Sequence, residues 1–233
     1  MSQIKRRIAT AFLNSKERSL AGCPRHLIMN ADKSGGHQQS RAFFERPAAT
    51  EFAAALIAGG KSRRMGRDKA LLTVSWRGRQ MPLWKRQLSV LQELKPGQIV
   101  LSGPDRPGSP VIAVPDRWEF AGPLAGIATC LEFCQQEYLL VLAVDLPRIG
   151  SECLKELLLS SGNGCGVVPV RGGRYEPLAA VYPRQARKSA IARLRRSELR
   201  LQDFVQELVS AGLVRSWPVP PRIDDQFTNW NSP

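Results

Sequence analysis

The segment LIAGGKSRRMGRDKALL, residues 56–72, decides the fold prediction because it joins an apolar run to a basic, glycine-rich loop. Residues 52–58 are continuously apolar, which is typical of a parallel strand buried on both faces. Gly59 and Gly60 follow directly, and a residue without a Cβ atom lets backbone N–H groups approach a ligand closely. The lysine and arginine side chains that come next suit the binding of a triphosphate. For the glycines alone, an exposed turn with solvated charges is an equal alternative.

The rest of the chain alternates between strands and helices. The apolar patterns predict strands at residues 98–102, 111–114, 138–144, 166–170, 175–182 and 214–218. They predict helices at residues 82–95, 122–136, 151–160, 184–196 and 198–211. This alternation is typical of a three-layer, Rossmann-like α/β fold with a mostly parallel sheet. Ligands of such sheets bind beyond the carboxyl ends of the strands, where Gly59 and Asp145 are expected.

The net charge of +14 indicates that the chain binds a negatively charged partner. Residues 1–50 hold nine Lys and Arg against three Asp and Glu, show no useful periodicity, and are expected to form a disordered extension. A basic chain can bind nucleic acid, an anionic membrane or phosphorylated small molecules, and the interleaved glycines favour the small molecules. No nucleic-acid-binding motif accompanies the charge, and no apolar run approaches the roughly 20 residues of a membrane span. Neither nucleic acid nor membrane is therefore an expected partner.

The cysteines indicate a reduced, cytoplasmic protein. The chain has five cysteines, an odd number with no C-x-x-C spacing, and only two histidines, so neither a disulfide framework nor a zinc site is expected. Arg6-Arg7 resembles a twin-arginine export signal, and residues 20–23 (LAGC) resemble a lipoprotein cleavage site. Both lack the apolar segment of about 7–15 residues that a leader needs.

Residues 58–69 (AGGKSRRMGRDK) resemble the signature A-G-G-x-S-x-R-M-G-x-D-K of the molybdenum cofactor guanylyltransferase family. Further matches follow in the family's order: Pro115-Asp116, GPLAGI at 122–127, Asp145-Leu146-Pro147, EPLA at 176–179 and FTNWNSP at 227–233. The resemblance covers residues 52–233, so the nucleotidyltransferase domain is expected at residues 51–233, without the basic extension. With so many motifs in register, the exposed-turn alternative loses its support.

The resemblance implies a role for each matched residue. The nucleotide would be contacted by Ile57, Ala58, Gly59, Gly60, Lys69, Ser102, Asp116 and Asp145. The catalytic residues would be Arg64 for the pyrophosphate leaving group, Lys69 for the phosphates and Asp145 for Mg²⁺, a hard cation that prefers oxygen ligands. Asn229 and Asn231 would face the pterin or the metal. Ser102 stands where some relatives carry asparagine, which leaves its contact with the nucleotide open.

Simple structural roles compete with several of these assignments. Asp145 would otherwise be a turn residue or a helix N-cap, and Asp116 would cap the helix near Gly122. Asn229 and Asn231 would otherwise supply turn chemistry.

The family's reaction transfers GMP from GTP to the phosphate of molybdopterin, with Mg²⁺, and implies partner proteins that deliver or receive the cofactor. The acceptor is a phosphate monoester with a second pKa near 6, so no general base is needed at neutral pH. A cytidylyltransferase acting on the same pterin is the nearest rival, because such relatives tend to have Ala-Ala-Gly where this chain has Ala58-Gly59-Gly60. Transfer to a sugar or alcohol phosphate and a non-catalytic nucleotide-binding module are further alternatives.

Overall fold

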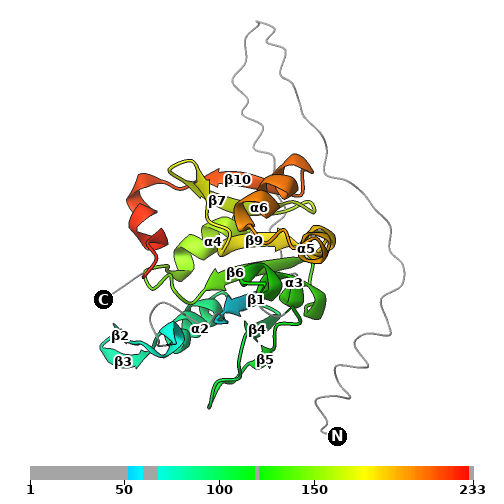
Figure 1. The fold of residues 1–233 in the computed structure, drawn as a ribbon. Coiled ribbons are helices and arrows are strands. Elements are labelled where there is room, and N and C mark those ends of the chain that lie inside the picture. The colour runs from blue at the N-terminus through cyan, green and yellow to red at the C-terminus, as the bar shows by residue number, and fades with distance from the viewer. Residues whose placement is uncertain (1–51, 60–67, 119–120, 231–233) are drawn as a thin grey trace, which may run out of the picture.

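A central sheet lies between two layers of helices (Figure 1). The protein is represented by a computed structural model, which describes residues 52–59, 68–118 and 121–230. The strands are β1 Phe52–Ile57, β2 Thr73–Trp76, β3 Arg79–Pro82, β4 Gln98–Ser102, β5 Ile112–Val114, β6 Tyr138–Ala143, β7 Gly166–Arg171, β8 Arg174–Tyr175, β9 Ala179–Pro183 and β10 Val214–Pro218. The α-helices are α2 Leu83–Glu93, α3 Pro123–Phe133, α4 Ser151–Leu159, α5 Ala186–Arg195 and α6 Leu201–Ser210, and η1 Lys69–Leu71 and η2 Pro221–Phe227 are 3₁₀ turns.

Eight of the described strands form one sheet in the order β10-β7-β9-β6-β1-β4-β5, with β8 paired to β7. Strands β6, β1, β4 and β5 run parallel to one another, and β10 runs parallel to β7. Strand β9 is antiparallel to both β6 and β7. The mostly parallel, three-layer Rossmann-like α/β fold predicted from the sequence is therefore confirmed. At the carboxyl end of β1, Ile57 is level with Ser102 of β4 and Ala143 of β6, so three of the predicted site segments meet there.

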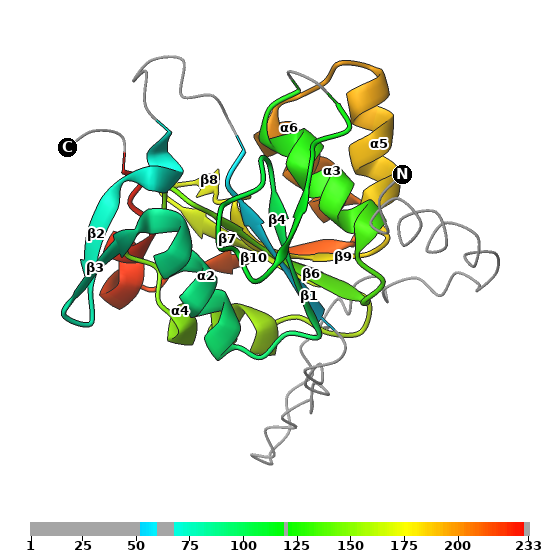
Figure 2. The same ribbon diagram turned by 90° about the horizontal axis from the view of Figure 1, so that it is seen from below.

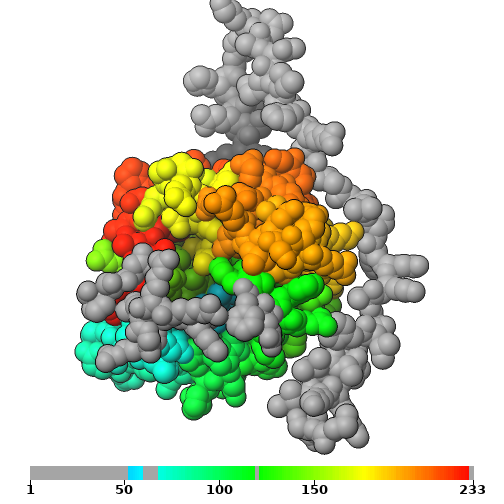
Figure 3. Space-filling view, in the orientation of Figure 1, coloured from blue at the N-terminus to red at the C-terminus, as the bar shows by residue number. Residues whose placement is uncertain are grey.

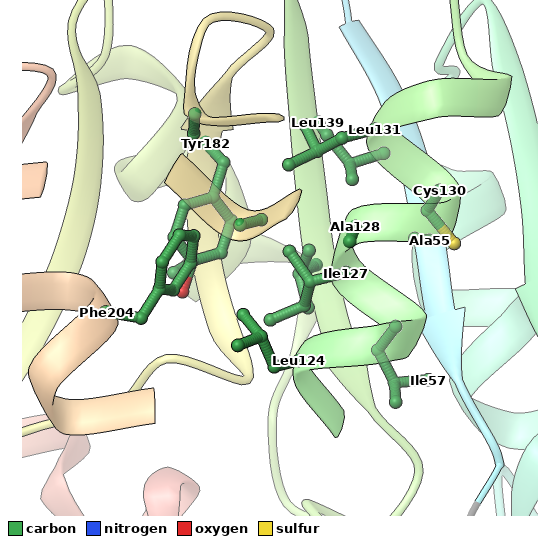
Figure 4. Packing of buried hydrophobic residues seen from close by; sticks show 14 of the residues in the cluster. Ala55, Ile57, Leu124, Ile127, Ala128, Cys130, Leu131, Leu139, Tyr182 and Phe204 are labelled. Carbon is green, nitrogen blue, oxygen red and sulfur yellow. The ribbon is translucent and has the colours of Figure 1, made fainter. Parts of the chain in front are cut away.

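The side chains of the central strands alternate between the two helical layers. In β1, Ala53 and Ala55 belong to the core under α3, α5 and α6, whereas Ala54 and Leu56 belong to the core under α2 and α4. Figure 2 shows these two groups of helices on opposite faces of the sheet. Figure 4 shows the first core, in which side chains from α3 lie near Tyr182 of β9 and Phe204 of α6. Burying one such large apolar side chain contributes about 1.5–3 kcal/mol. Because the apolar side chains of both helical layers pack against β1, both layers stabilise the position of this strand.

Three details of the chain differ from the sequence prediction. The continuous strand expected at residues 175–182 is wrong, because the chain leaves the ladder between β8 and β9. Pro177 lies in this break and has no N–H group to donate to a ladder. Helix α3 ends at Phe133, earlier than the predicted residue 136, and the hairpin of β2 and β3 was not predicted.

The predicted basic extension, residues 1–50, lies outside the described residues. Among the helices that are described, none combines the length and the apolar character needed to cross a membrane.

In the space-filling view of Figure 3 the cyan-to-green segments form one side of the molecule and the yellow-to-red segments the other.

Candidate functional site

A pocket of about 230 Å³ opens at the carboxyl ends of β1 and β6. Its walls come from the end of β1, from η1, from the N-terminus of α3, from the turn after β6 and from the segment before β9. The lining residues are Ile57, Ala58, Gly59, Asp68, Lys69, Pro123, Ala143, Val144, Asp145 and Leu178. Five of the residues predicted to contact the nucleotide are among them, so segments distant in the sequence converge on one cavity.

The loop after β1 passes very close to the loop after β4. A Cβ atom on Gly103 would lie 2.8 Å from the Cα atom of Gly59, and Gly103 has a φ angle of +118°. Both the contact and the backbone conformation therefore require glycine at position 103. Helix α3 approaches equally closely, since a Cβ atom on Gly126 would lie 2.5 Å from Ser102 Oγ. The end of β4 is thus packed against the loop after β1 through Gly103 and against α3 through Ser102.

The Asp116 carboxylate lies beside Gly59. Its Oδ1 atom accepts a hydrogen bond of 2.9 Å from Ser102 Oγ, and its Oδ2 atom is 3.3 Å from where a Cβ atom on Gly59 would stand. Burial raises the pKa of Asp116, and the bond from Ser102 partly offsets this rise. Helix α3 has Gly122 at its N-cap and no side-chain cap, so the capping role considered for Asp116 is wrong. The hydroxyl of Ser102 instead orients a carboxylate whose second oxygen faces Gly59.

Lys69 and Asp145 face each other across the pocket. The Lys69 Nζ atom is 4.0 Å from Asp145 Oδ2 and donates a hydrogen bond of 3.1 Å to the carbonyl oxygen of Trp230. The Trp230 N–H group in turn donates to the Asp145 carbonyl oxygen at 2.9 Å. The side chains of Lys69 and Asp145 are 20% and 29% exposed. The C-terminal segment therefore ties the lysine to the turn that carries the carboxylate.

The Asp145 carboxylate is poorly solvated. Burial raises its pKa, and the positive charge of Lys69 partly offsets the rise. Helix α4 has Gly150 as its N-cap and begins at Ser151, so the helix-capping alternative for Asp145 is wrong. Divalent cations such as Mg²⁺ are usually held by one or two carboxylates together with substrate phosphates, so the half-buried Asp145 carboxylate has the chemistry that one ligand of such a cation needs.

Arg106 was not singled out in the sequence, yet it braces the pocket wall. Its guanidinium donates to the Asp68 carboxylate through Nη1 and to the Ala58 carbonyl oxygen through Nη2, the latter at 3.2 Å. The Arg106 side chain is only 7% exposed. Asp68 also accepts a hydrogen bond from the Ala70 N–H group and so caps the turn that carries Lys69. These contacts link the β4 loop to both ends of the glycine-rich segment.

The structure brings most of the predicted site residues together. Ile57, Ala58, Gly59, Lys69 and Asp145 line the pocket, and Ser102 and Asp116 lie directly beside Gly59. Asn229 is exposed and next to Trp230, which contacts both Lys69 and Asp145. The predictions for Gly60, Arg64 and Asn231 lie outside the described residues.

The chain is similar to a known family of nucleotide-handling domains. Residues 54–211 match the model of the MobA-like NTP transferase domain. A probable molybdenum cofactor guanylyltransferase from Opitutus terrae is 38% identical over 191 residues, which are 79% of this chain and 93% of the relative. One of the same description from Pelotomaculum thermopropionicum is 34% identical over 64% of this chain and 72% of the relative.

Solved structures share the fold. The molybdopterin-guanine dinucleotide biosynthesis protein A of Archaeoglobus fulgidus superimposes with a TM-score of 0.63 at 21% identity, over 78% of this chain and 93% of that one. A 2-C-methyl-D-erythritol 4-phosphate cytidylyltransferase from Thermus thermophilus superimposes with a TM-score of 0.55 at 17% identity, over 77% and 92% of the two chains. At these identities the likeness concerns the fold alone.

Proposed function

Because the chain belongs to the family of MobA-like NTP transferases, we propose that it transfers GMP from GTP to the phosphate of molybdopterin, releasing pyrophosphate. The observation that carries this proposal is the meeting of Lys69 and Asp145 at one pocket that Gly59 also lines. A cation for phosphates and a carboxylate for a divalent metal are the two charges that nucleotidyl transfer requires. The names of the relatives support molybdopterin as the acceptor.

Guanine recognition is assigned to Asp116 and the backbone beside Gly59. Guanine carries two neighbouring donors, N1–H and the 2-amino group, whereas cytosine carries one amino donor next to a ring acceptor. The Asp116 carboxylate offers acceptor oxygens only, and its Oδ2 atom faces the space beside Gly59. A methyl group at position 59 would intrude on this space, since its carbon would lie 3.3 Å from Oδ2. This arrangement supports GTP over CTP.

The transfer itself needs no general base. An oxygen of the acceptor phosphate, dianionic above its second pKa near 6, attacks the α-phosphorus of GTP. A new P–O bond forms to the acceptor, the bond to the β-phosphate bridging oxygen breaks, and that oxygen leaves as part of pyrophosphate. Lys69 neutralises charge that develops on the phosphates, and Asp145 would hold Mg²⁺, which supplies Lewis-acid stabilisation of phosphate oxygens when bound. Arg64 is assigned to the leaving pyrophosphate and Asn229 and Asn231 to the pterin side.

The same assignment implies a cytoplasmic enzyme that exchanges its substrate and product with other proteins. The reduced state expected of its cysteines supports this location: the four that the structure describes are buried and form no disulfide with one another, and burial raises the pKa of Cys134 and Cys153 to about 12. A thiol with a raised pKa is a poor nucleophile, so we assign no step of the transfer to Cys134 or Cys153.

The function is tested by pyrophosphate release from the full chain with Mg²⁺, molybdopterin and each of the four nucleoside triphosphates. We expect turnover with GTP that depends on both molybdopterin and the metal. Turnover with CTP in place of GTP would make the chain a cytidylyltransferase. GTP binding without pyrophosphate release would indicate a non-catalytic nucleotide-binding module, and release with sugar or alcohol phosphates alone would indicate a different acceptor class.

Replacing Asp116 with asparagine is expected to lower kcat/KM for GTP by about 10–100-fold, because a hydrogen bond to a charged acceptor contributes about 1.5–3 kcal/mol. The rate with CTP should change by less than threefold, so the preference between the two nucleotides narrows. Ser102→Ala is the matched control, since it removes the bond that orients Asp116 but keeps the charge, and its loss should be smaller. An Asp116→Asn variant with the wild-type preference for GTP would contradict the assignment.

A further inference from the structure

Gln87, on the helix beneath the pocket, contacts the backbone on both sides of Asp145. We propose that Gln87 is a positioning residue, which fixes the turn that presents the Asp145 carboxylate to the metal of the nucleotide complex. The inference rests on the proposed function, because it assumes that Asp145 binds that metal. Gln87 itself lies behind the turn and touches neither the pocket nor, by our proposal, the substrate.

The contacts are two hydrogen bonds from one side-chain amide. Gln87 is fully buried on α2, and its Nε2 atom donates to the carbonyl oxygen of Ala143 at 3.1 Å and to that of Leu146 at 2.8 Å. These carbonyl groups stand two residues before Asp145 and one residue after it. A primary amide has two hydrogens, so both bonds can form at once.

The orientation of the amide is defined by its other end. The Gln87 Oε1 atom accepts a hydrogen bond from the guanidinium of Arg86, which is itself buried. An amide turned by 180° would place its oxygen against two carbonyl oxygens and its NH₂ group against a guanidinium. Because both ends would then be mismatched, the hydrogen-bond network selects one orientation.

The other peptide groups of the turn are held by different elements. The Val144 N–H group donates to the Ile57 carbonyl oxygen of β1 at 3.0 Å, and the Asp145 carbonyl oxygen accepts from Trp230 at 2.9 Å. Leu146 accepts a second and longer bond, 3.3 Å, from the Ile149 N–H group. Gln87 is the side chain that joins the start of the turn to its end. Without it, the backbone around Asp145 loses the two hydrogen bonds that α2 provides.

Such support matters because a metal carboxylate must stay in place when no metal is bound. Side chains that hold ligands from behind typically contribute 10–100-fold to metal affinity or activity. Asp145 has only two side-chain torsions, so the backbone of its turn determines most of where its oxygens lie. A glutamine that served stability alone would affect unfolding and leave metal binding unchanged.

The test compares Gln87→Met, which keeps the volume and removes both donors, with the wild-type chain and with Leu91→Ala. Leu91 is buried on the same helix one turn further along, so its truncation destabilises the same layer but keeps both hydrogen bonds from Gln87 to the Asp145 turn. The probe is a fluorescent GTP analogue with a methylene bridge between its α- and β-phosphates, which cannot be turned over. Its Kd is measured in EDTA and in saturating Mg²⁺, and the ratio of the two values reports how strongly metal and nucleotide are coupled. Hydrogen exchange of residues 143–149 is followed by mass spectrometry.

We expect Gln87→Met to lower this ratio about tenfold, to leave the Kd in EDTA within twofold, and to speed exchange at residues 143–149. Leu91→Ala should lower the melting temperature at least as much but keep the wild-type ratio. The inference is overturned if Gln87→Met keeps the wild-type ratio, if Leu91→Ala loses it equally, or if the wild-type chain shows no coupling. Gln87→Asn, whose amide is one methylene shorter, provides the same test if the methionine variant does not fold. Neither readout uses molybdopterin, so this test is independent of the transfer reaction. A chain that binds Mg²⁺ and GTP together but releases no pyrophosphate would contradict the proposed transfer of GMP without contradicting the role of Gln87.

Discussion

Asparagine in place of Asp145 is expected to lower kcat for pyrophosphate release about 1,000-fold at saturating GTP, molybdopterin and Mg²⁺. The substitution keeps the shape of the side chain but removes the charge that a hard cation requires. A loss of 1,000-fold corresponds to about 4 kcal/mol of transition-state stabilisation, which is within what a metal or one oxyanion donor supplies. Pyrophosphate release by the purified full chain measures it directly.

The same variant is expected to fold at least as well as the wild-type chain when no metal is present. Burial raises the pKa of Asp145, so the ionised carboxylate is less favourable in the folded chain than in the unfolded one. At neutral pH the charge therefore opposes folding, and a neutral amide removes that opposition. Adding Mg²⁺ to the GTP-bound chain should raise the melting temperature of the wild-type protein further and leave that of GTP-bound Asp145→Asn almost unchanged.

A charge-matched control separates the metal site from the general effect of a lost negative charge. Asp203 lies exposed on α6, which covers the other face of the sheet. Asp203→Asn should keep kcat within twofold. A kcat of Asp145→Asn within tenfold of the wild-type value would remove Asp145 from the metal site.

The sequence predicted the parts of this fold whose burial is uniform. Strands β4 and β10 lie at their predicted residues, and β1 and β6 end within one residue of prediction. For β1 and β6 the reason is that a short, continuously apolar run is typical of a strand buried on both faces. The resemblance read from the glycine-rich segment is confirmed by the family match over residues 54–211. The hairpin of β2 and β3 was not predicted, although polar and apolar residues alternate along β2 and a glycine follows it at position 78. In the structure these residues alternate between exposed and half-buried, and Arg77 and Gly78 both adopt the positive φ angles of a tight hairpin turn.

The supports of the site could not have been predicted in the same way. Arg106 reaches Asp68 across 38 positions of the chain, and Gln87 reaches Ala143 across 56. A buried glutamine on a helix looks in sequence like any polar residue on an exposed face, because nothing local says which face is covered. Motif residues are found by their order along the chain, whereas the residues that hold them are found only once the helices are packed on the sheet.

Methionine in place of Lys69 is expected to lower kcat by about 100-fold or more and to weaken the binding of pyrophosphate. The substitution keeps the apolar stem of the side chain and removes an ammonium group that stands at the pocket wall. Charge-assisted contacts to phosphate oxygens are the strongest hydrogen bonds available to the site, and their value grows where water is excluded. Pre-steady-state release of pyrophosphate, together with its Kd as a product inhibitor, measures both losses.

Arginine at position 69 tests whether charge alone is sufficient. The Lys69 ammonium is already oriented before any nucleotide arrives, because Trp230 accepts one of its hydrogens and Asp145 lies 4.0 Å away. A planar guanidinium cannot reproduce that compact geometry, so Lys69→Arg should restore pyrophosphate binding more fully than kcat. Such a split follows from preorganisation, in which a charge stabilises the transition state only from a fixed position. Equal recovery of both values would mean that Lys69 acts as a general counter-charge, and a Lys69→Met variant with wild-type kcat would exclude it from the transfer.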